Sequence, residues 1–319
     1  MSLPDRDYQT SKLSKAKAAI RKLKAGSSPL EAASKGNDAT WQPGLYVVAT
    51  PIGNLKDISS RALFALKAAD VIACEDTRRT GRLLQAFEIK TKLVAYHDHS
   101  TAKDRDRLLN AIADGQIVVL VSDAGTPCIA DPGFKLVRAA HELQLPVIPI
   151  PGPNAAITAL SVAGLPTDRF LFEGFLPNKT FARKQRLNAV KNLDATLVFY
   201  ETGPRLEAML TDAITELGNR PCAILRELTK IYETVKLTDL VSILDELANG
   251  EPRKGEIVVL IGGASGSKEW EQSAIDGLLL EQSATKPPKQ AARVIAEETG
   301  LPTKTLYARL LKLKKSETN

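Results

Sequence analysis

The chain has 319 residues, a formal net charge of +6 and a hydrophobic fraction of 44%. At roughly 150 residues per domain, this length predicts about two domains whose cores form without disulfide or metal staples. Cys74, Cys128 and Cys222 are widely spaced, which excludes a disulfide framework and a C-x-x-C metal site. No apolar run approaches the ~20 residues of a membrane span, and the Lys/Arg-rich start has no apolar segment typical of a secretory signal. The default expectation is a cytoplasmic, reducing setting.

The positive charge is concentrated at the two ends of the chain. Residues 1–43 carry +4 and residues 286–319 carry +5, which leaves −3 for the body between them. Basic ends favour a polyanionic partner, because lysine and arginine contacts release counterions from phosphates. The simpler interpretation is that both ends are solvated and keep the protein soluble.

The chain begins with a segment rich in Ser, Lys, Ala and Gly, and residues 1–43 are predicted to form a basic, flexible arm. From Gly44 onward, apolar runs alternate with amphipathic stretches. Strands are expected at 45–49, 71–74, 117–122, 147–150, 170–173, 196–200, 223–226 and 257–261. Helices are expected at 60–68, 79–87, 102–113, 133–143, 154–163, 181–192, 205–217 and 237–247. Because the strand-like runs are apolar on both faces, this alternation predicts an α/β fold with a largely parallel sheet in at least the first half.

Glycine and proline divide the α/β region. The segment Gly164-Leu-Pro-Thr-Asp168 ends one helix before the next strand begins. We therefore expect two α/β domains, at 44–163 and 164–264, followed by a small helical module at 265–319.

Four loops rich in small residues and proline follow the expected strands. They are Thr50–Leu55, Glu75–Arg78, Ser122–Gly133 and Pro149–Asn154. Each alone is compatible with a plain turn, but α/β enzymes bind ligands at the carboxyl ends of strands, so together the loops favour a shared cleft. The sequence has no G-x-G-x-x-G and no G-x-x-x-x-G-K-[ST] phosphate loop. A pocket of small and apolar residues suits a cofactor that carries an adenosine but no pyrophosphate.

These loops also carry a family resemblance. Ala49-Thr-Pro-Ile-Gly-Asn-Leu55, Cys74-Glu-Asp-Thr-Arg78, Ser122-Asp-Ala-Gly-Thr-Pro127, Asp131-Pro-Gly133 and Pro151-Gly-Pro-Asn154 resemble the tetrapyrrole methylase (class III methyltransferase) superfamily. Tyr96-His-Asp-His99, Phe199-Tyr-Glu201 and Arg226-Glu-Leu-Thr229 are similar to its branch that methylates a cytidine ribose 2′-hydroxyl in bacterial 16S ribosomal RNA. The resemblance covers residues 44–264. It implies a tetrapyrrole methylase-like fold with S-adenosylmethionine in a cleft between two α/β domains, no metal, a homodimer, and the small ribosomal subunit as partner.

The resemblance also implies a set of cofactor-binding residues, carried over position by position. They are Pro51, Asp123, Ala124, Gly125, Ile129, Ala130, Ala155, Ala156, Tyr200, Leu225 and Arg226. The sequence has Ser122-Asp-Ala-Gly where tetrapyrrole-making members tend to have a Gly-Asp-Pro turn. This departure favours the RNA branch over porphyrinoid substrates.

Methylation of a ribose hydroxyl needs a base or a strong hydrogen-bond acceptor, because the hydroxyl is a weak nucleophile. The candidates are Glu75, Asp76, His97, Asp123, Glu201 and Glu227. Asp76 is favoured because it ends a strand, and because Arg78 follows at a distance that suits gripping the phosphate next to the target sugar. His97 is expected at the polar lip of the cleft, in contact with RNA or cofactor.

Each of these residues has a simpler structural interpretation. Asp76 is equally suited to cap the next helix. Glu201 and Glu227 are equally suited to be ion-paired scaffold residues. His97 and His99 have no third ligand in register, so a metal site is not expected.

The end of the chain predicts two helices around the turn at Thr299–Thr303. Their apolar positions are Ala292, Ile295, Ala296, Leu306, Leu310 and Leu313, in a pattern that resembles a helix-turn-helix. The basic residues Lys304, Arg309, Lys312, Lys314 and Lys315 decorate the second helix. We expect them to contact RNA phosphates, which adds affinity without sequence reading. The alternative is a helical hairpin packed on the body, with solvated lysines.

The leading hypothesis is thus S-adenosylmethionine-dependent 2′-O-methylation of small-subunit ribosomal RNA. A tetrapyrrole C-methyltransferase is the second hypothesis, and it gives the basic ends no use. A non-enzymatic nucleic-acid-binding regulator is the third, and it predicts sequence-specific binding to duplex DNA. The nearly neutral body, with few residues able to reach base edges, argues against that third hypothesis.

Overall fold

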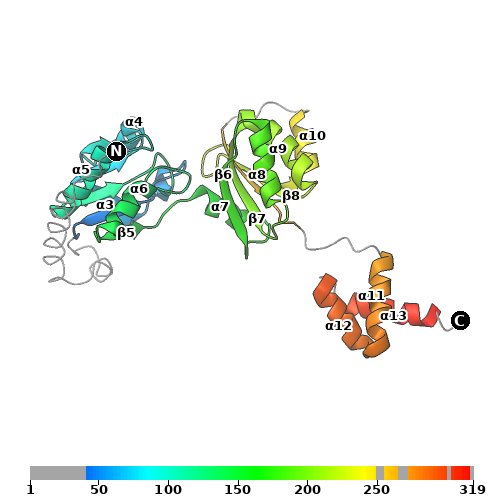
Figure 1. The fold of residues 1–319 in the computed structure, drawn as a ribbon. Coiled ribbons are helices and arrows are strands. Elements are labelled where there is room, and N and C mark those ends of the chain that lie inside the picture. The colour runs from blue at the N-terminus through cyan, green and yellow to red at the C-terminus, as the bar shows by residue number, and fades with distance from the viewer. Residues whose placement is uncertain (1–40, 249–254, 265–271, 300–302, 317–319) are drawn as a thin grey trace, which may run out of the picture.

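The computed structural model describes residues 41–248, 255–264, 272–299 and 303–316. These residues form two sheets of five strands each, followed by a cluster of helices at the end of the chain (Figure 1). The basic arm predicted for residues 1–43 falls outside the described residues, except for its last three positions. Within the described ranges, no helix is both long and apolar enough to cross a membrane.

The first sheet is entirely parallel, as expected from its apolar runs, and its strand order is β3-β2-β4-β1-β5. Its strands are β1 (Gly44–Val48), β2 (Val71–Cys74), β3 (Leu93–Ala95), β4 (Ile117–Leu120) and β5 (Val147–Ile150). The central strand β1 pairs Leu45 with Val118 of β4 and with Val147 of β5. The carboxyl ends of β4, β1 and β5 therefore lie side by side at one edge of the sheet.

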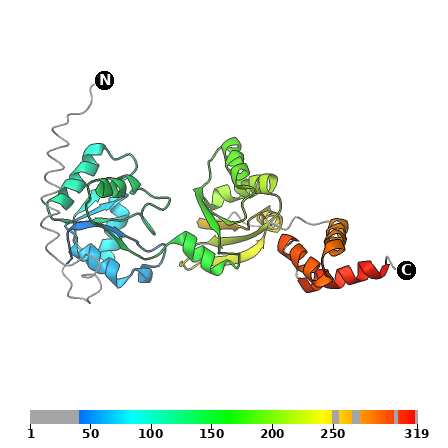
Figure 2. The same cartoon turned by 60° about the horizontal axis from the view of Figure 1, so that its bottom comes forward.

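Helices cover both faces of this sheet (Figure 2). They are α3 (Ser60–Ala68) and α4 (Thr77–Ala86) on one face, and α5 (Ala102–Ala113) and α6 (Phe134–Glu142) on the other. Leu66 of α3 packs with Ile72 in one core, and Leu109 of α5 packs with Leu136 of α6 in the other. A short 3-10 helix, η2 (Leu55–Asp57), follows β1.

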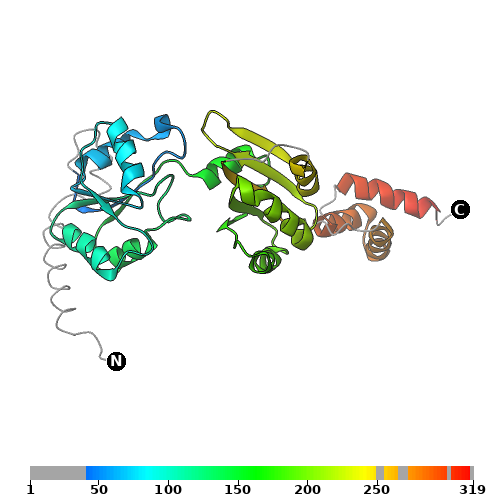
Figure 3. The same ribbon diagram turned by 90° about the horizontal axis from the view of Figure 1, so that it is seen from above.

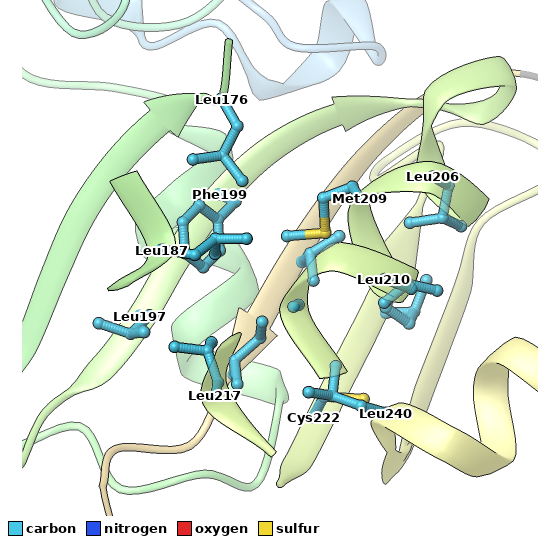
Figure 4. Close-up of a cluster of buried hydrophobic side chains, with 14 of the residues drawn as sticks. Leu176, Leu187, Leu197, Phe199, Leu206, Met209, Leu210, Leu217, Cys222 and Leu240 are labelled. Atoms are coloured by element: carbon cyan, nitrogen blue, oxygen red, sulfur yellow. The ribbon is translucent and has the colours of Figure 1, made fainter. Parts of the chain in front are cut away.

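The second sheet is mixed, with strand order β6-β7-β10-β8-β9. Its strands are β6 (Phe170–Phe175), β7 (Thr196–Thr202), β8 (Pro221–Arg226), β9 (Thr234–Asp239) and β10 (Glu256–Ile261). Only the β6–β7 pair is parallel, and β10 runs antiparallel to both β7 and β8. One face carries α8 (Thr180–Val190), α9 (Gly203–Leu217) and α10 (Leu240–Ala248) over a core that includes Phe199 and Met209 (Figure 4).

The helix α7 (Ala155–Val162) packs on the other face of the second sheet. Its Ala159 and Leu160 are buried with Val198 and Leu260. The predicted domain boundary at 163–164 follows this helix. Because α7 packs with the second sheet, the chain passes from the first sheet to the second before α7, in the turn at 151–154 (Figure 1). The first turn of α7 is thereby brought next to the loops of the first sheet.

The helical module at the end of the chain has three described helices (Figure 3). They are α11 (Gln272–Thr285), α12 (Pro288–Thr299) and α13 (Thr303–Ser316). Ile295 and Leu310, both predicted to be apolar contact positions, are buried with Leu279 of α11, a helix that the sequence analysis did not predict. Arg309 forms an ion pair with Asp276 of α11, with Nη2 2.8 Å from Oδ2, so its charge is used inside the module.

Candidate functional site

Three of the four predicted loops are tied together by hydrogen bonds at the edge of the first sheet. The N–H of Thr50 donates to the carbonyl of Gly125 (2.9 Å), and the N–H of Gly125 donates back to Thr50 (3.0 Å). The hydroxyl of Thr126 donates to the carbonyl of Pro153 (3.0 Å). Gly125 has a φ of +77°, a conformation that favours glycine. The loops after β1, β4 and β5 thus form one wall.

The segment after Thr126 is held in an unusual backbone conformation. Cys128 and Ala130 both have left-handed φ angles, of 70° and 61°. Such a conformation costs roughly 1–2 kcal/mol for a residue with a Cβ, so the surrounding contacts must stabilise it. In this conformation Ile129, Ala130 and Asp131 all line the same cavity.

Tyr200 at the end of β7 connects the second sheet to this wall. Its hydroxyl accepts a hydrogen bond from the N–H of Ala156 in the first turn of α7 (3.2 Å). Its ring lies 5.0 Å from that of Phe172 and 5.6 Å from that of Phe175, both in edge-on contact. Burial raises the pKa of the Tyr200 phenol, which keeps the hydroxyl protonated.

We expect Tyr200→Phe to destabilise the protein by about 1–3 kcal/mol, because the Ala156 N–H loses its acceptor. Equilibrium unfolding in urea measures the change, and Phe175→Leu, which removes a neighbouring ring but no hydrogen bond, is the comparison. An unchanged free energy of unfolding in Tyr200→Phe would show that the hydrogen bond contributes nothing.

A cavity of about 250 Å³ lies between the two walls. Seven of the predicted cofactor residues line it: Ala124, Gly125, Ile129, Ala130, Ala155, Tyr200 and Leu225. The other four, Pro51, Asp123, Ala156 and Arg226, do not line it. Pro51 and Asp123 face a second cavity beside α4 instead, and Ala156 is buried beneath Tyr200.

Part of the cavity lining was not predicted from the sequence. Asp131 belongs to the motif Asp131-Pro-Gly133, but it was given no role of its own. Phe175 and the segment Glu256–Val258 also line the cavity without having been predicted, whereas Glu201, which lines it too, was one of the candidate bases. The strand β10 brings its amino end to the site because it is antiparallel to β7 and β8, and no local sequence signal marks this.

Two carboxyl groups on the cavity wall have raised pKa values. Burial and the nearby charge of Glu75 raise the pKa of Asp131 to about 6. Burial also raises the pKa of Glu201, although its carboxylate accepts the N–H of Thr202 (2.8 Å) and lies 3.1 Å from Arg205. Asp131 therefore changes charge near neutral pH at the wall of the cavity.

Asp76 and Arg78 are engaged with each other and do not line the cavity. The Arg78 guanidinium donates two hydrogen bonds to the Asp76 carboxylate (2.8 and 3.2 Å), and the Arg78 N–H donates a third (2.8 Å). These bonds lower the pKa of Asp76 to about 2. The last of these bonds caps the N-terminus of α4. The contacts of Asp76 are therefore those of a helix N-cap, which was its alternative interpretation in the sequence.

Of the other predicted polar residues, Glu201 lines the main cavity, whereas Asp123, Glu227 and His97 do not. The Asp123 carboxylate accepts the N–H of Asp76 (3.0 Å) and lies 3.6 Å from Arg79, so it joins two loops. Glu227 pairs with Lys230 at 2.9 Å. His97 lines a smaller cavity, of about 80 Å³, which shares Asp131 with the main one.

The residues that line the main cavity fit a nucleoside that carries a sulfonium group. Alanine, glycine and isoleucine residues leave room for a flat base, and Phe175 and Tyr200 supply aromatic surface. The Asp131 carboxylate on the wall complements a positive charge, whereas the charge of Glu201 is paired with Arg205. Within the described part of the chain, no cluster of three His, Cys, Asp or Glu side chains is placed to hold a metal ion.

Comparison with known proteins places this site in a family. The model of the tetrapyrrole (corrin/porphyrin) methylases matches residues 44–243, and that of the RsmI C-terminal HTH domain matches residues 271–314. The chain belongs to the tetrapyrrole methylase family. Among its methylase relatives is a Mesorhizobium japonicum protein named ribosomal RNA small subunit methyltransferase I, 47% identical over 86% of this chain and 93% of the relative. Relatives with the same name in Escherichia coli O157:H7 (47%, over 83% and 94%) and Halalkalibacterium halodurans (43%, over 82% and 93%) match nearly as much.

Solved structures show the same methylase fold at low identity. A cobalt precorrin-4 methyltransferase superposes with a TM-score of 0.51 at 16% identity, over 68% of this chain and 94% of that one. A diphthine synthase gives the same TM-score and identity, over 69% and 89%. The predicted fold class and the predicted family are therefore confirmed.

Proposed function

We propose that this tetrapyrrole methylase transfers a methyl group from S-adenosylmethionine to small-subunit ribosomal RNA, at the ribose 2′-hydroxyl of a cytidine. The relatives named ribosomal RNA small subunit methyltransferase I carry the proposal, because 43–47% identity extends over 82–86% of this chain and 93–94% of theirs. The Ser122-Asp-Ala-Gly turn supports the RNA branch over a porphyrinoid substrate.

The cofactor is proposed to lie in the cavity of about 250 Å³ between the two walls. Gly125, Ala130 and Ala155 would let its adenosine approach the backbone, and Tyr200 and Leu225 would close over it from the second sheet. When bound, S-adenosylmethionine supplies an electrophilic methyl on sulfur, so the protein has to bind and align the acceptor. Pro51, Asp123, Ala156 and Arg226 would then support the wall from behind.

The base for the acceptor hydroxyl is proposed to be Asp131. It is the carboxylate that lines both the main cavity and the adjoining small one. A carboxylate with a pKa of about 6 is ionised at neutral pH and still basic enough to accept a proton. In this role Asp131 would accept the proton that the ribose hydroxyl loses when it takes the methyl group, and S-adenosylmethionine would supply that methyl group and be left as S-adenosylhomocysteine. Asp76, the base favoured by the sequence, remains the competing assignment.

The proposal places the protein beside ribosomes in the cytoplasm, as a homodimer. Ile231, Tyr232 and Leu237 are exposed apolar side chains on and before the edge strand β9, with exposed fractions of 94%, 74% and 57%. A second copy covering this edge would remove them from water. Light scattering coupled to gel filtration tests the mass, and a monomer at micromolar concentration would refute the dimer.

The function is tested with labelled S-adenosylmethionine and small ribosomal subunits from cells that lack the endogenous enzyme. Label in RNA, at one nucleotide whose 3′ bond resists alkaline cleavage, is the expected result because a 2′-O-methyl group blocks that cleavage. Label on a porphyrinoid precursor, or on no substrate, would overturn the proposal. A gel-shift with duplex DNA tests the regulator hypothesis in the same preparation.

The helical module is proposed to bind RNA phosphates through Lys304 and Lys312, which are both exposed on α13. We expect the double variant Lys304→Gln/Lys312→Gln to weaken binding to small subunits about tenfold and to reduce the salt dependence by about two phosphate contacts. Lys67→Gln/Lys92→Gln removes two exposed lysines from the first sheet's helices and loops and serves as the control. Equal salt slopes in wild type and the α13 variant would mean that the module does not contact RNA.

A further inference from the structure

The small cavity next to Asp131 has no role in the function derived so far. It has a volume of about 80 Å³, and it is lined by the turn after β3, by α5 and by the start of α6. Its polar side chains are Tyr96, His97, Asp98, Ser100, Arg105, Asp131 and Lys135. Because Asp131 lines both cavities, a ligand here would lie on one side of Asp131 and the occupant of the cofactor cavity on the other.

Two nitrogen atoms of this cavity are buried without hydrogen-bond partners among the described residues. They are Nδ1 of His97 and Nε of Arg105. Buried polar nitrogens are nearly always paired in native proteins, because an unpaired one costs roughly 1–3 kcal/mol. Arg105 also forms no ion pair within the described ranges, although a guanidinium keeps its charge at any physiological pH. A bound anion would give the half-buried Arg105 guanidinium the partner that the described residues do not supply.

The start of α6 adds donors to the same cavity. Gly133, the N-cap of α6, provides no side-chain hydrogen bond, and Gly133, Phe134 and Lys135 all line the cavity. The first N–H groups of a helix have no partner within the helix, and they carry partial positive charge. Lys135 adds a full positive charge at the exposed rim. Asp98 and Asp131 are the opposing carboxylates; Asp98 is exposed, and Asp131 stands at the side shared with the cofactor cavity.

We propose that this small cavity binds one phosphodiester of the RNA substrate, held by Arg105, His97 and the start of α6. The proposal rests on the proposed function, because it takes the ligand to be the phosphate beside the methylated ribose. That ribose would then lie at Asp131, between the phosphate in the small cavity and the methyl donor in the large one. The planar guanidinium of Arg105 matches the paired oxygens of a phosphodiester, and the cavity has room for a single such group.

The role proposed here for His97 narrows the sequence prediction, which placed it at the polar lip of the cleft in contact with RNA or cofactor. Its main-chain N–H donates to the Ser100 hydroxyl (2.9 Å), and the Ser100 N–H donates to the His97 carbonyl (2.8 Å). This tight turn holds the main chain of His97 beside the cavity, and its imidazole, with the hydrogen on Nδ1, would donate to a phosphate oxygen. The phosphate grip expected of Arg78 would belong to Arg105 instead.

The test uses Arg105→Gln, with Arg107→Gln as the matched control. Arg107 lies on the same helix α5, is exposed and does not line the cavity. With small subunits as substrate, we expect Arg105→Gln to raise KM about 10- to 100-fold with kcat changed less than about threefold, since one charged hydrogen bond is lost in ground and transition states alike. The Kd for S-adenosylmethionine should not change, and Arg105→Lys should recover part of the loss. An unchanged KM would overturn the proposal.

Melting temperatures with and without inorganic phosphate test anion binding in the cavity without any RNA. Phosphate should raise the melting temperature of wild type and of Arg107→Gln but not of Arg105→Gln, because only a formed site gains from a bound ligand. Without phosphate, Arg105→Gln should melt at the same or a higher temperature, since it removes an unpaired, half-buried cation. A phosphate effect equal in all three proteins, or a lower melting temperature in Arg105→Gln alone, would mean that Arg105 is structural and that water fills the cavity. If wild type methylates no RNA, the proposed function fails, while these melts still decide whether the cavity is an anion site.

Discussion

Asp131→Asn is expected to lower kcat on small ribosomal subunits by about 10²- to 10⁴-fold, the contribution typical of a positioned general base. The amide has nearly the same shape as the carboxylate but cannot accept the proton of the ribose hydroxyl. Because Asp131 is only one of many residues on the cavity wall, the Kd for S-adenosylmethionine should change little. Single-turnover kinetics and calorimetric titration of the cofactor measure the two effects separately.

The pH dependence follows from the raised pKa of Asp131. Its carboxylate is protonated below about pH 6, so the wild-type rate should fall about tenfold per pH unit below that value. Stability changes in the opposite sense. The folded state holds the proton to a higher pH than the unfolded state, so stability is lost as pH rises from about 4 to about 6. Asp131→Asn should therefore stabilise the protein at pH 7.5, by on the order of 1 kcal/mol.

Asp76→Asn is the decisive comparison for this prediction. Asparagine is as good an N-cap as aspartate, so α4 should keep its start, although the paired Arg78 is released. If Asp131 is the base, Asp76→Asn keeps most of its kcat. A large loss of kcat in Asp76→Asn combined with a small one in Asp131→Asn would restore the assignment favoured by the sequence.

The sequence does not show which of these two aspartates lines the cofactor cavity. Asp76 and Asp131 both follow strands of the first sheet, β2 and β4, and both therefore lie at its carboxyl edge. The strand order β3-β2-β4-β1-β5 decides which of them meets the second sheet, and strand order cannot be read from local sequence. In addition, the unusual backbone at Cys128 and Ala130 sets the position of Asp131, and neither residue type signals a left-handed φ.

The elements that could be predicted are those with strong local signals. The fully buried strand Val71–Cys74 and the edge strand Val147–Ile150, in which Ile148 and Ile150 are buried, were predicted at their observed bounds, because short apolar runs bounded by turns are typical of strands. The strand β3 has three residues, none of them buried, and β9 is a largely polar edge strand with no buried residue, so neither has that signal. Because β9 was missed, the helix expected from residue 237 begins at Leu240.

Ala155→Phe is expected to weaken S-adenosylmethionine binding by on the order of 100-fold, or about 2.7 kcal/mol. Ala155 is the first residue of α7 and lines the main cavity, while the N-cap side chain of Asn154 holds the helix start through the Ile157 N–H (3.1 Å). A phenyl ring at this position has to enter the cavity, since the Ala156 N–H beside it is tied to Tyr200. The cofactor would then compete for space with a side chain of the protein itself.

The control for this prediction is Val162→Phe on the same helix. Val162 is 52% exposed, so the added ring there points to no cavity and should leave the cofactor Kd unchanged. Both variants should keep the wild-type circular dichroism, because neither changes the buried face of α7 at Ala159 and Leu160. If Ala155→Phe binds S-adenosylmethionine as tightly as wild type while remaining folded, the cofactor does not lie between the loops of the first sheet and Tyr200. The roles proposed for Asp131 and for the phosphate cavity beside it would then fail as well, because both require the methyl donor in the main cavity.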